Sequence, residues 1–169
     1  EVGGGTVLFP SGVYLTGTIQ LKSNVTLHLD AGATILGSKN LDDYEEISDP
    51  LHTRSSEKWN IALVEGQNLR NIAITGRGTI DGNKVTNPEG EEGYRGPHGI
   101  YLSKCERILI QDIFVKDAGN YAHIMEGCSN GNLRGVTVTG GSDGIDLFDC
   151  KDFIITDCHF KTGDDCLAG

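Results

Sequence analysis

Two consecutive segments, 133–150 and 151–169, repeat each other, and this repeat constrains the fold more than any other feature of the chain. Their apolar residues superpose at a step of 22 positions, and the superposed pairs are Leu133 with Ile155, Val136 with Cys158, and Val138 with Phe160. The same step carries Asp143 onto Asp165, and Asp164 lies beside Asp165. If the repeat stacks like residues on like residues, three carboxylates gather in one patch.

The apolar pattern of these segments, apolar-x-x-apolar-x-apolar, extends further back along the chain. We align four copies at steps of 41, 23 and 22 residues: Leu69/Ile72/Ile74, Ile110/Ile113/Val115, Leu133/Val136/Val138 and Ile155/Cys158/Phe160. An insertion over residues 81–99 accounts for the long first step. A strand-based repeat of this size predicts an all-β parallel solenoid of about three strands per coil, with coils about 4.8 Å apart.

The first third of the chain also predicts short strands. Its apolar pieces alternate with period 2 and lie at 7–9, 13–15, 19–21, 25–29 and 34–36, with turn residues between them. No stretch has the 3.6-residue period of a substantial helix. Residues 38–60 are acidic and irregular, and we expect a long loop whose Trp59 either anchors the loop or stacks on a sugar ring.

Composition excludes several classes of function. The net charge of −10 argues against nucleic acid and anionic membranes as bulk partners, and no apolar run approaches the roughly 20 residues of a membrane span. The five cysteines contain no C-x-x-C spacing, so we do not expect a structural zinc site. We also expect no cofactor. Cys158 falls on the apolar register, which favours a small core residue over a disulfide.

The chain is expected to be a single solenoid domain over residues 1–169. It opens directly on a strand-like segment and stops inside the repeat at Gly169, and neither end carries a polar capping segment. We therefore expect a piece of a longer solenoid, incomplete at the C-terminus and also at the N-terminus. The oligomeric state is left open.

Three of the seven aspartates between residues 143 and 165 are the candidate catalytic groups. The residues Asp149, Asp152 and Asp157 are explained as solvated turn residues, whereas stacking brings Asp143, Asp164 and Asp165 together. Like charges about 5 Å apart raise the pKa of one member. A protonated carboxyl beside an ionised one is what hydrolysis of a glycosidic bond requires.

Strict strand alternation poses a difficulty, because it turns Asp143 toward the same inner face as Ile145. We expect Gly144 and Gly163 to let the backbone leave strand geometry at these points. Calcium binding by the three carboxylates is an alternative, but the segment lacks a D-x-D-x-D-G loop. We therefore expect no metal here.

Two aspartate motifs carry a family resemblance. Ser142-Asp143-Gly-Ile-Asp146 followed by Gly163-Asp164-Asp165-Cys166 resembles the polygalacturonase-like glycoside hydrolases of family 28, and the opening segments 3–19 and 21–38 are similar to that family's first coils. The resemblance implies a right-handed parallel β-helix (the pectin-lyase-like solenoid) and hydrolysis of pectic polysaccharide with inversion. It also implies that Asp164 is the general acid, that Asp143 and Asp165 hold and activate water, and that the protein is secreted or periplasmic.

The chain departs from the family pattern in ways that bear on substrate. Ser142 stands where the family usually has Asn, and Leu147 where Pro is common. The Gly-His-Gly and Arg-x-Lys motifs that normally follow the paired aspartates lie beyond Gly169, so we expect these 169 residues alone to be inactive. The candidate substrate-binding residues are Ser142, Asn120, Tyr121, His123 and Arg95, of which Asn120 is expected to stack beneath Asp143.

Two other functions remain open at this level. A calcium-dependent β-helix polysaccharide lyase would add a basic residue near the acids and would be sensitive to chelators. A non-catalytic carbohydrate-binding solenoid would keep its affinity after Asp164→Asn, whereas an enzyme would lose turnover. All three share a polysaccharide as the partner.

Overall fold

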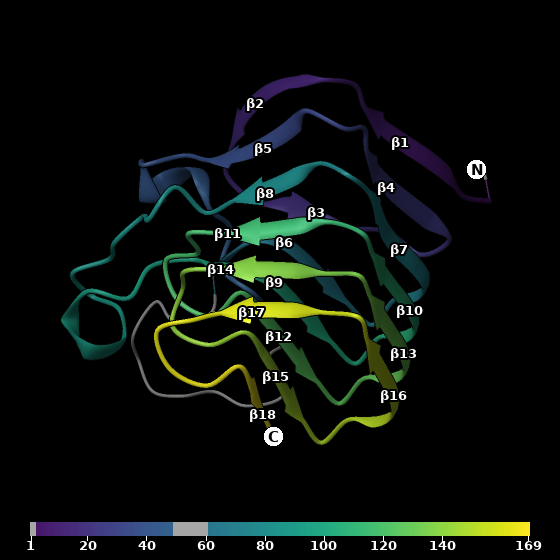
Figure 1. Cartoon of the computed structure of the whole chain (residues 1–169). Helices are drawn as coiled ribbons and strands as arrows, with labels where there is room; N and C mark the ends of the chain where they lie inside the picture. Colours follow the sequence, from purple (N-terminus) through teal and green to yellow (C-terminus); the bar gives the residue numbers. More distant parts are fainter. Residues whose placement is uncertain (1–2, 49–60) are drawn as a thin grey trace.

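The computed structural model describes residues 3–48 and 61–169, and these form six stacked coils (Figure 1). Each coil contributes one strand to each of three six-stranded sheets, and every pair of neighbouring strands is parallel. The stack runs from β1 beside the N-terminus to β18 beside the C-terminus, with the two ends of the chain at opposite ends (Figure 1). The predicted all-β parallel β-helix is therefore confirmed.

The bounds of the strands follow the order of the sheets. The first sheet contains β1 (Gly5–Phe9), β4 (Val25–Leu29), β7 (Arg70–Gly76), β10 (Glu106–Gln111), β13 (Ser129–Arg134) and β16 (Lys151–Thr156). The second contains β2 (Gly12–Thr16), β5 (Ala33–Gly37), β8 (Thr79–Asp81), β11 (Phe114–Lys116), β14 (Thr137–Thr139) and β17 (His159–Lys161). The third contains β3 (Ile19–Gln20), β6 (Ala62–Gln67), β9 (His98–Ser103), β12 (His123–Glu126), β15 (Ile145–Phe148) and β18 (Leu167–Ala168).

Two short 3₁₀ turns, η1 (Leu41–Asp43) and η2 (Glu91–Gly93), complete the elements of the described residues. No helix in this part of the chain is long and apolar enough to cross a membrane. Trp59 lies outside the described residues.

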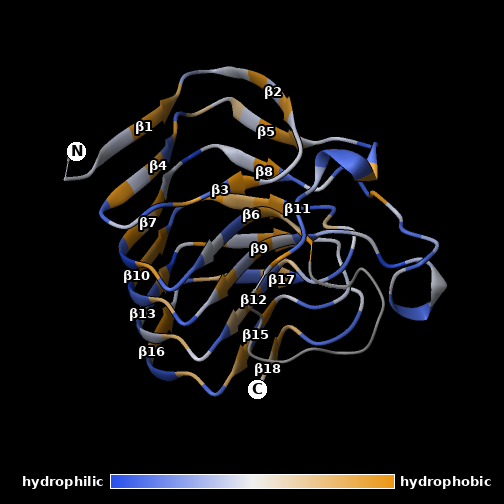
Figure 2. Ribbon diagram, turned by 180° about the vertical axis from the view of Figure 1, so that it is seen from behind, coloured by the Kyte–Doolittle hydropathy of each residue, from blue (hydrophilic) through white to orange (hydrophobic). Residues whose placement is uncertain are grey.

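The core is a column of apolar side chains inside the coils. Ile110 pairs with Ile74 on one neighbouring strand and with Leu133 on the other, and all three are almost fully buried. Alternate residues of the same strands face outward, as Ile154 of β16 does with 58% of its surface exposed. Figure 2 shows the resulting mixture of hydrophobic and hydrophilic segments along the strands. Period-2 patterning thus buries one face of each strand and solvates the other.

The register confirms the predicted steps of 23 and 22. Ile110, Leu133 and Ile155 align across β10, β13 and β16, and the corresponding residues of the second sheet align across β11, β14 and β17.

The predicted first step of 41 is wrong. Ile74 pairs with Ile110, a step of 36, and Ile80 pairs with Val115, a step of 35. Ile80 lies six residues after Ile74, whereas Val115 lies five residues after Ile110, so this coil has one residue more and does not fit the apolar-x-x-apolar-x-apolar template. The template matched Leu69 to Ile110 instead of Ile74 to Ile110, because Leu69 is also apolar and Ile74 lies at the correct distance after it.

The corners of the coils are built from residues in the left-handed region of backbone space. Asp149, Asp152 and Asp157 have φ of 50°, 57° and 54°, and all three are exposed. Aspartate and asparagine tolerate this conformation better than most residues. This explains why these three aspartates stand in the repeat. The expectation that they are solvated turn residues is confirmed for Asp149 and Asp157, whereas Asp152 is exposed but lies within β16.

All five cysteines are free thiols. Cys158 is half-buried and packs against the core, as its place in the apolar register predicted. Cys105, Cys128 and Cys150 recur at steps of 23 and 22 at the corner that leads into the first sheet. The backbone N–H of Cys105 lies 3.4 Å from Cys128 Sγ. The sequence spacing of these three cysteines therefore repeats the register of the strands.

Candidate active site

The connections from the second sheet to the third gather at one edge of the solenoid. Asp143 lies between β14 and β15, and Asp164 and Asp165 lie between β17 and β18 in the next coil. The Gly144 N–H donates to the Asp165 carbonyl at 2.9 Å, and the Asp164 N–H donates to the Ser142 carbonyl at 2.8 Å. The stacked backbone therefore brings the three predicted aspartates to one corner, although Asp164 and Asp165 lie 21 and 22 residues after Asp143 along the chain.

None of the three carboxyl groups enters the apolar core. Asp143 is half-buried, Asp164 and Asp165 are exposed, and the core strand β15 begins only at Ile145. As predicted, the backbone is outside strand geometry at Gly144 and Gly163, although neither residue has a left-handed φ. The left-handed residues of this corner are Gly140 and Gly141, whose φ values are 73° and 77°.

Gly144 has a different role, which is to provide space. A Cβ at this position would lie 2.4 Å from the carbonyl oxygen of Cys166 and 2.8 Å from the Phe160 ring. Only a glycine lets the two aspartate corners approach this closely.

Burial is the main reason that the pKa of Asp143 lies above its ordinary value. The neighbouring carboxylates of Asp164 and Asp165 raise this pKa further, since a second negative charge nearby is unfavourable. Two groups act in the opposite direction: the Ser142 hydroxyl, which donates to Asp143 Oδ1 at 3.2 Å, and the positive charge of Arg95. Asp143 is therefore a carboxyl group tuned by its neighbours, as expected at a catalytic site.

A surface depression of about 590 Å³ opens beside the aspartates. One side is formed by the coil corners, including Ser142 and Asp164. The other side is formed by the insertion between β8 and β9, which contributes Lys84, Tyr94 and Arg95. The insertion protrudes as the teal loop at the left of Figure 1. The predicted insertion thus forms a wall of the candidate site.

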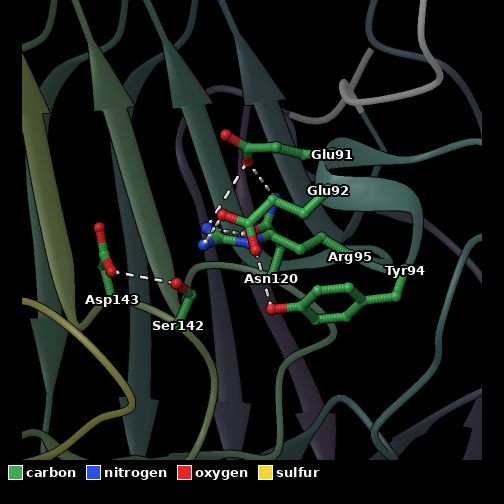
Figure 3. A network of polar contacts seen from close by, with 7 residues as sticks. All are labelled: Glu91, Glu92, Tyr94, Arg95, Asn120, Ser142 and Asp143. Atoms are coloured by element: carbon green, nitrogen blue, oxygen red, sulfur yellow. Dashed lines mark hydrogen bonds and ion pairs between the residues drawn. The ribbon is translucent and has the colours of Figure 1, made fainter.

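Arg95 is the centre of a polar network in this wall (Figure 3). Its guanidinium donates to Glu92 Oε1 at 2.8 Å and to Asn120 Oδ1 at 3.3 Å, and it lies 3.7 Å from Glu91 Oε2. The Tyr94 hydroxyl donates to Glu92 at 2.9 Å. The network joins the insertion to the corner of the adjacent coil, which carries Asn120.

The five predicted substrate-binding residues fall into two groups. Ser142 and Arg95 line the depression. Asn120, Tyr121 and His123 are 1%, 6% and 0% exposed, so their side chains lie behind the surface that a sugar would contact.

Asn120 does not lie directly beneath Asp143. Its carbonyl accepts from the Ser142 N–H at 3.0 Å, which places it against the preceding residue. The reason is that the repeat step between these two coils shortens from 23 residues at β11, where Val115 pairs with Val138, to 22 residues at β12, where His123 pairs with Ile145.

His123 faces the interior of the solenoid. Its cross-strand partners, Ile100 and Ile145, belong to the core, and its Nδ1 lies 3.0 Å from the carbonyl of Gly144. Burial lowers the pKa of His123 to about 4, so the ring is neutral at pH 7. A neutral ring donates from Nδ1 to Gly144 and thereby braces the corner between the aspartates.

Sequence reasoning missed Lys84 and Tyr94 as residues of the depression. Lys84 is 77% exposed, and its ammonium lies 3.5 Å from Asp117 Oδ1. Insertion length was the only available signal, because an irregular loop has no period from which the direction of a side chain can be read. Across residues 3–48 and 61–169, no group of three His, Cys, Asp or Glu side chains is arranged to hold a metal ion.

Comparison with known proteins identifies the family. The sequence model described as "Glycosyl hydrolases family 28" matches residues 3–168. The chain belongs to glycosyl hydrolase family 28. A probable polygalacturonase of Vitis vinifera is 29% identical over 98% of this family 28 chain, and a polygalacturonase of Malus domestica is 26% identical over 87% of it. The chain spans 37% and 32% of the lengths of these two relatives.

Solved structures of family 28 share the fold. An exopolygalacturonase of Thermotoga maritima superposes over 98% of this chain and 46% of its own, with a TM-score of 0.80 and 25% identity. A family 28 exopolygalacturonase of Yersinia enterocolitica covers 96% of this chain and 38% of its own, with a TM-score of 0.83 and 24% identity. The solenoid described above is therefore the family 28 β-helix.

Proposed function

We propose that this chain carries the catalytic aspartates of a glycoside hydrolase that cleaves pectic polysaccharide of galacturonan or rhamnogalacturonan type. The observation that carries the proposal is the stacking of Asp143 with Asp164 and Asp165 at an exposed corner beside an open depression. Family membership and the polygalacturonase names of the relatives support the substrate class.

In the proposed mechanism Asp164 protonates the leaving glycosidic oxygen. Asp143 and Asp165 hold a water molecule on the other face of the sugar and remove its proton as it attacks, which inverts the anomeric centre. The raised pKa of Asp143 suits this role, because a carboxylate of higher pKa is the stronger base. No metal is needed in this scheme.

The walls of the depression suggest how an anionic sugar is held. The Ser142 hydroxyl lines the depression and can hydrogen-bond to a sugar as well as to Asp143. The exposed Lys84 ammonium offers a positive charge to a uronate carboxylate. Asn120, Tyr121 and His123 support this surface from behind, where they are buried.

The 169-residue chain itself is proposed to be inactive, since it lacks the Gly-His-Gly and Arg-x-Lys motifs that the family resemblance places after the paired aspartates. Polygalacturonate incubated with this chain should release no reducing ends. Measurable release would overturn this part of the proposal and leave the roles of the aspartates intact.

The roles are tested in the longest form of the protein that can be expressed, with polygalacturonate and rhamnogalacturonan as substrates. Asp164→Asn and Asp143→Asn should each lower kcat by at least about 10²-fold, because each removes one proton-transfer group. Asp149→Asn is the matched control, since that aspartate is an exposed turn residue. Hydrolysis that survives both site substitutions, or a parent without activity on either substrate, would refute the proposal.

A further inference from the structure

Arg95 is unusually constrained for a residue in an irregular insertion. Its side chain is only 11% exposed, and its Cζ lies 5.6 Å from the centre of the Tyr121 ring. The backbone is held as well, because Arg95 N–H donates to the Glu91 carbonyl at 3.0 Å and Gly96 N–H donates to the Gly119 carbonyl at 3.1 Å. Burial of the side chain and the hydrogen bonds of the backbone therefore fix the position of the guanidinium.

The charges around Arg95 make it a poor clamp for a substrate carboxylate. The carboxylates of Glu92 and Glu91 already lie against its terminal nitrogens, and the side-chain oxygen of Asn120 accepts a hydrogen bond from the same guanidinium. A uronate would have to displace one of these partners or approach a guanidinium whose charge is already balanced. The exposed Lys84 is better suited to that purpose.

A continuous chain of contacts leads from Arg95 to Asp143. The guanidinium donates to the Asn120 side chain, and the Asn120 carbonyl accepts from the Ser142 N–H at 3.0 Å. The Ser142 hydroxyl then donates to Asp143 Oδ1 (Figure 3). The insertion and two successive coil corners are thus connected by two side-chain hydrogen bonds and one backbone hydrogen bond.

The charged groups that act on Asp143 are of both signs. Asp164 and Asp165 of the following coil disfavour its ionised form, as does burial, whereas Arg95 favours it. Lys84 and Asp117, farther along the depression, pair with each other at 3.5 Å. Arg95 is therefore the positive charge among the described residues that offsets the carboxylates around Asp143.

We propose that Arg95 is a positioning residue for Asp143: it holds the Asn120–Ser142–Asp143 chain of contacts in place and adds a positive charge that offsets the carboxylates around Asp143. The proposal rests on the proposed function, in which Asp143 must be a carboxylate to accept a proton. It assigns the insertion a role in the chemistry of the site in addition to forming its wall.

The test is an NMR titration of the aspartate carboxyl carbons in the 169-residue chain, which requires no catalytic activity. In Arg95→Gln the midpoint of Asp143 should move upward by less than the roughly one pH unit that an opposite charge about 4–6 Å away produces, because the charge of Arg95 acts on Asp143 less than burial, Ser142 and the two aspartates do. Arg95→Lys keeps the charge and should move the midpoint by much less. Arg107→Gln, which removes an exposed arginine of the first sheet, should leave it unchanged.

Glu92→Gln keeps Arg95 and should shift the titration midpoint of Asp143 in the opposite direction. It frees the guanidinium from one carboxylate, so the Asp143 midpoint should move downward. Amide spectra of the strands report whether each variant keeps its fold. An unchanged Asp143 midpoint in Arg95→Gln, or an equal upward shift in Arg95→Lys, would overturn the proposal. Neither result would bear on whether Asp143 is catalytic, which the hydrolysis assay of Asp143→Asn decides separately.

Discussion

The division of each strand into an inner and an outer face predicts very different costs for the same substitution at two isoleucines of the first sheet. Ile110 is fully buried between Ile74 and Leu133, whereas Ile154 is 58% exposed. Ile110→Ala removes three buried carbon groups, which is about 2.4 kcal/mol of transfer free energy at about 0.8 kcal/mol each. The cavity left in the stacked core adds about 1 kcal/mol or more, so the free energy of unfolding should fall by about 3–4 kcal/mol.

The assay is urea unfolding of the two alanine variants and the parent, followed by far-ultraviolet circular dichroism. Ile154→Ala should change the free energy of unfolding by less than about 0.5 kcal/mol, because its side chain is already largely in water. The slope of free energy against urea should be the same for all three proteins. Equal losses at the two positions would show that the inward and outward faces are assigned wrongly, and the placement of the aspartate corner would fall with them.

Two further predictions concern the corner itself. The pKa of His123 is about 4 in the folded chain and about 6.5 in the unfolded chain, so the unfolded state binds the extra proton first as the pH falls. The free energy of unfolding should therefore drop by about 3 kcal/mol between pH 6.5 and 4. The variant His123→Leu should abolish this loss, whereas His159→Gln, which replaces an exposed histidine, should not. Gly144→Ala should destabilise the fold by about 1–3 kcal/mol, since its Cβ would lie 2.4 Å from the Cys166 carbonyl oxygen, whereas Gly3→Ala, which has open space around it, should be neutral in the same unfolding assay.

The repeat was readable because stacking imposes the same requirement on every coil. Leu133 and Ile155 occupy one position of the core, so each must be apolar, and their spacing appears directly in the chain. The aspartates follow from the same rule, since a fixed step carries Asp143 to Asp165. Their separation from the solvated Asp149, Asp152 and Asp157 could also be predicted, because turn positions recur with the same period.

The rule failed where a coil changed its length. The extra residue before β8 shifted the apparent match of Ile74 from Ile110 to Val115, and a contraction of the step moved Asn120 from Asp143 to Ser142. A shift of one residue in a strand reverses the direction of a side chain, so small changes in length have large consequences.

The amino-acid sequence by itself determined the solenoid, its parallel sheets and the edge at which three carboxylates meet, because periodic residues report on contacts that repeat. Tertiary structure alone decided that Arg95 reaches Asn120 at the corner of the adjacent coil. That placement depends on how one irregular insertion packs against the coils, and a contact made only once leaves no periodic trace in the chain.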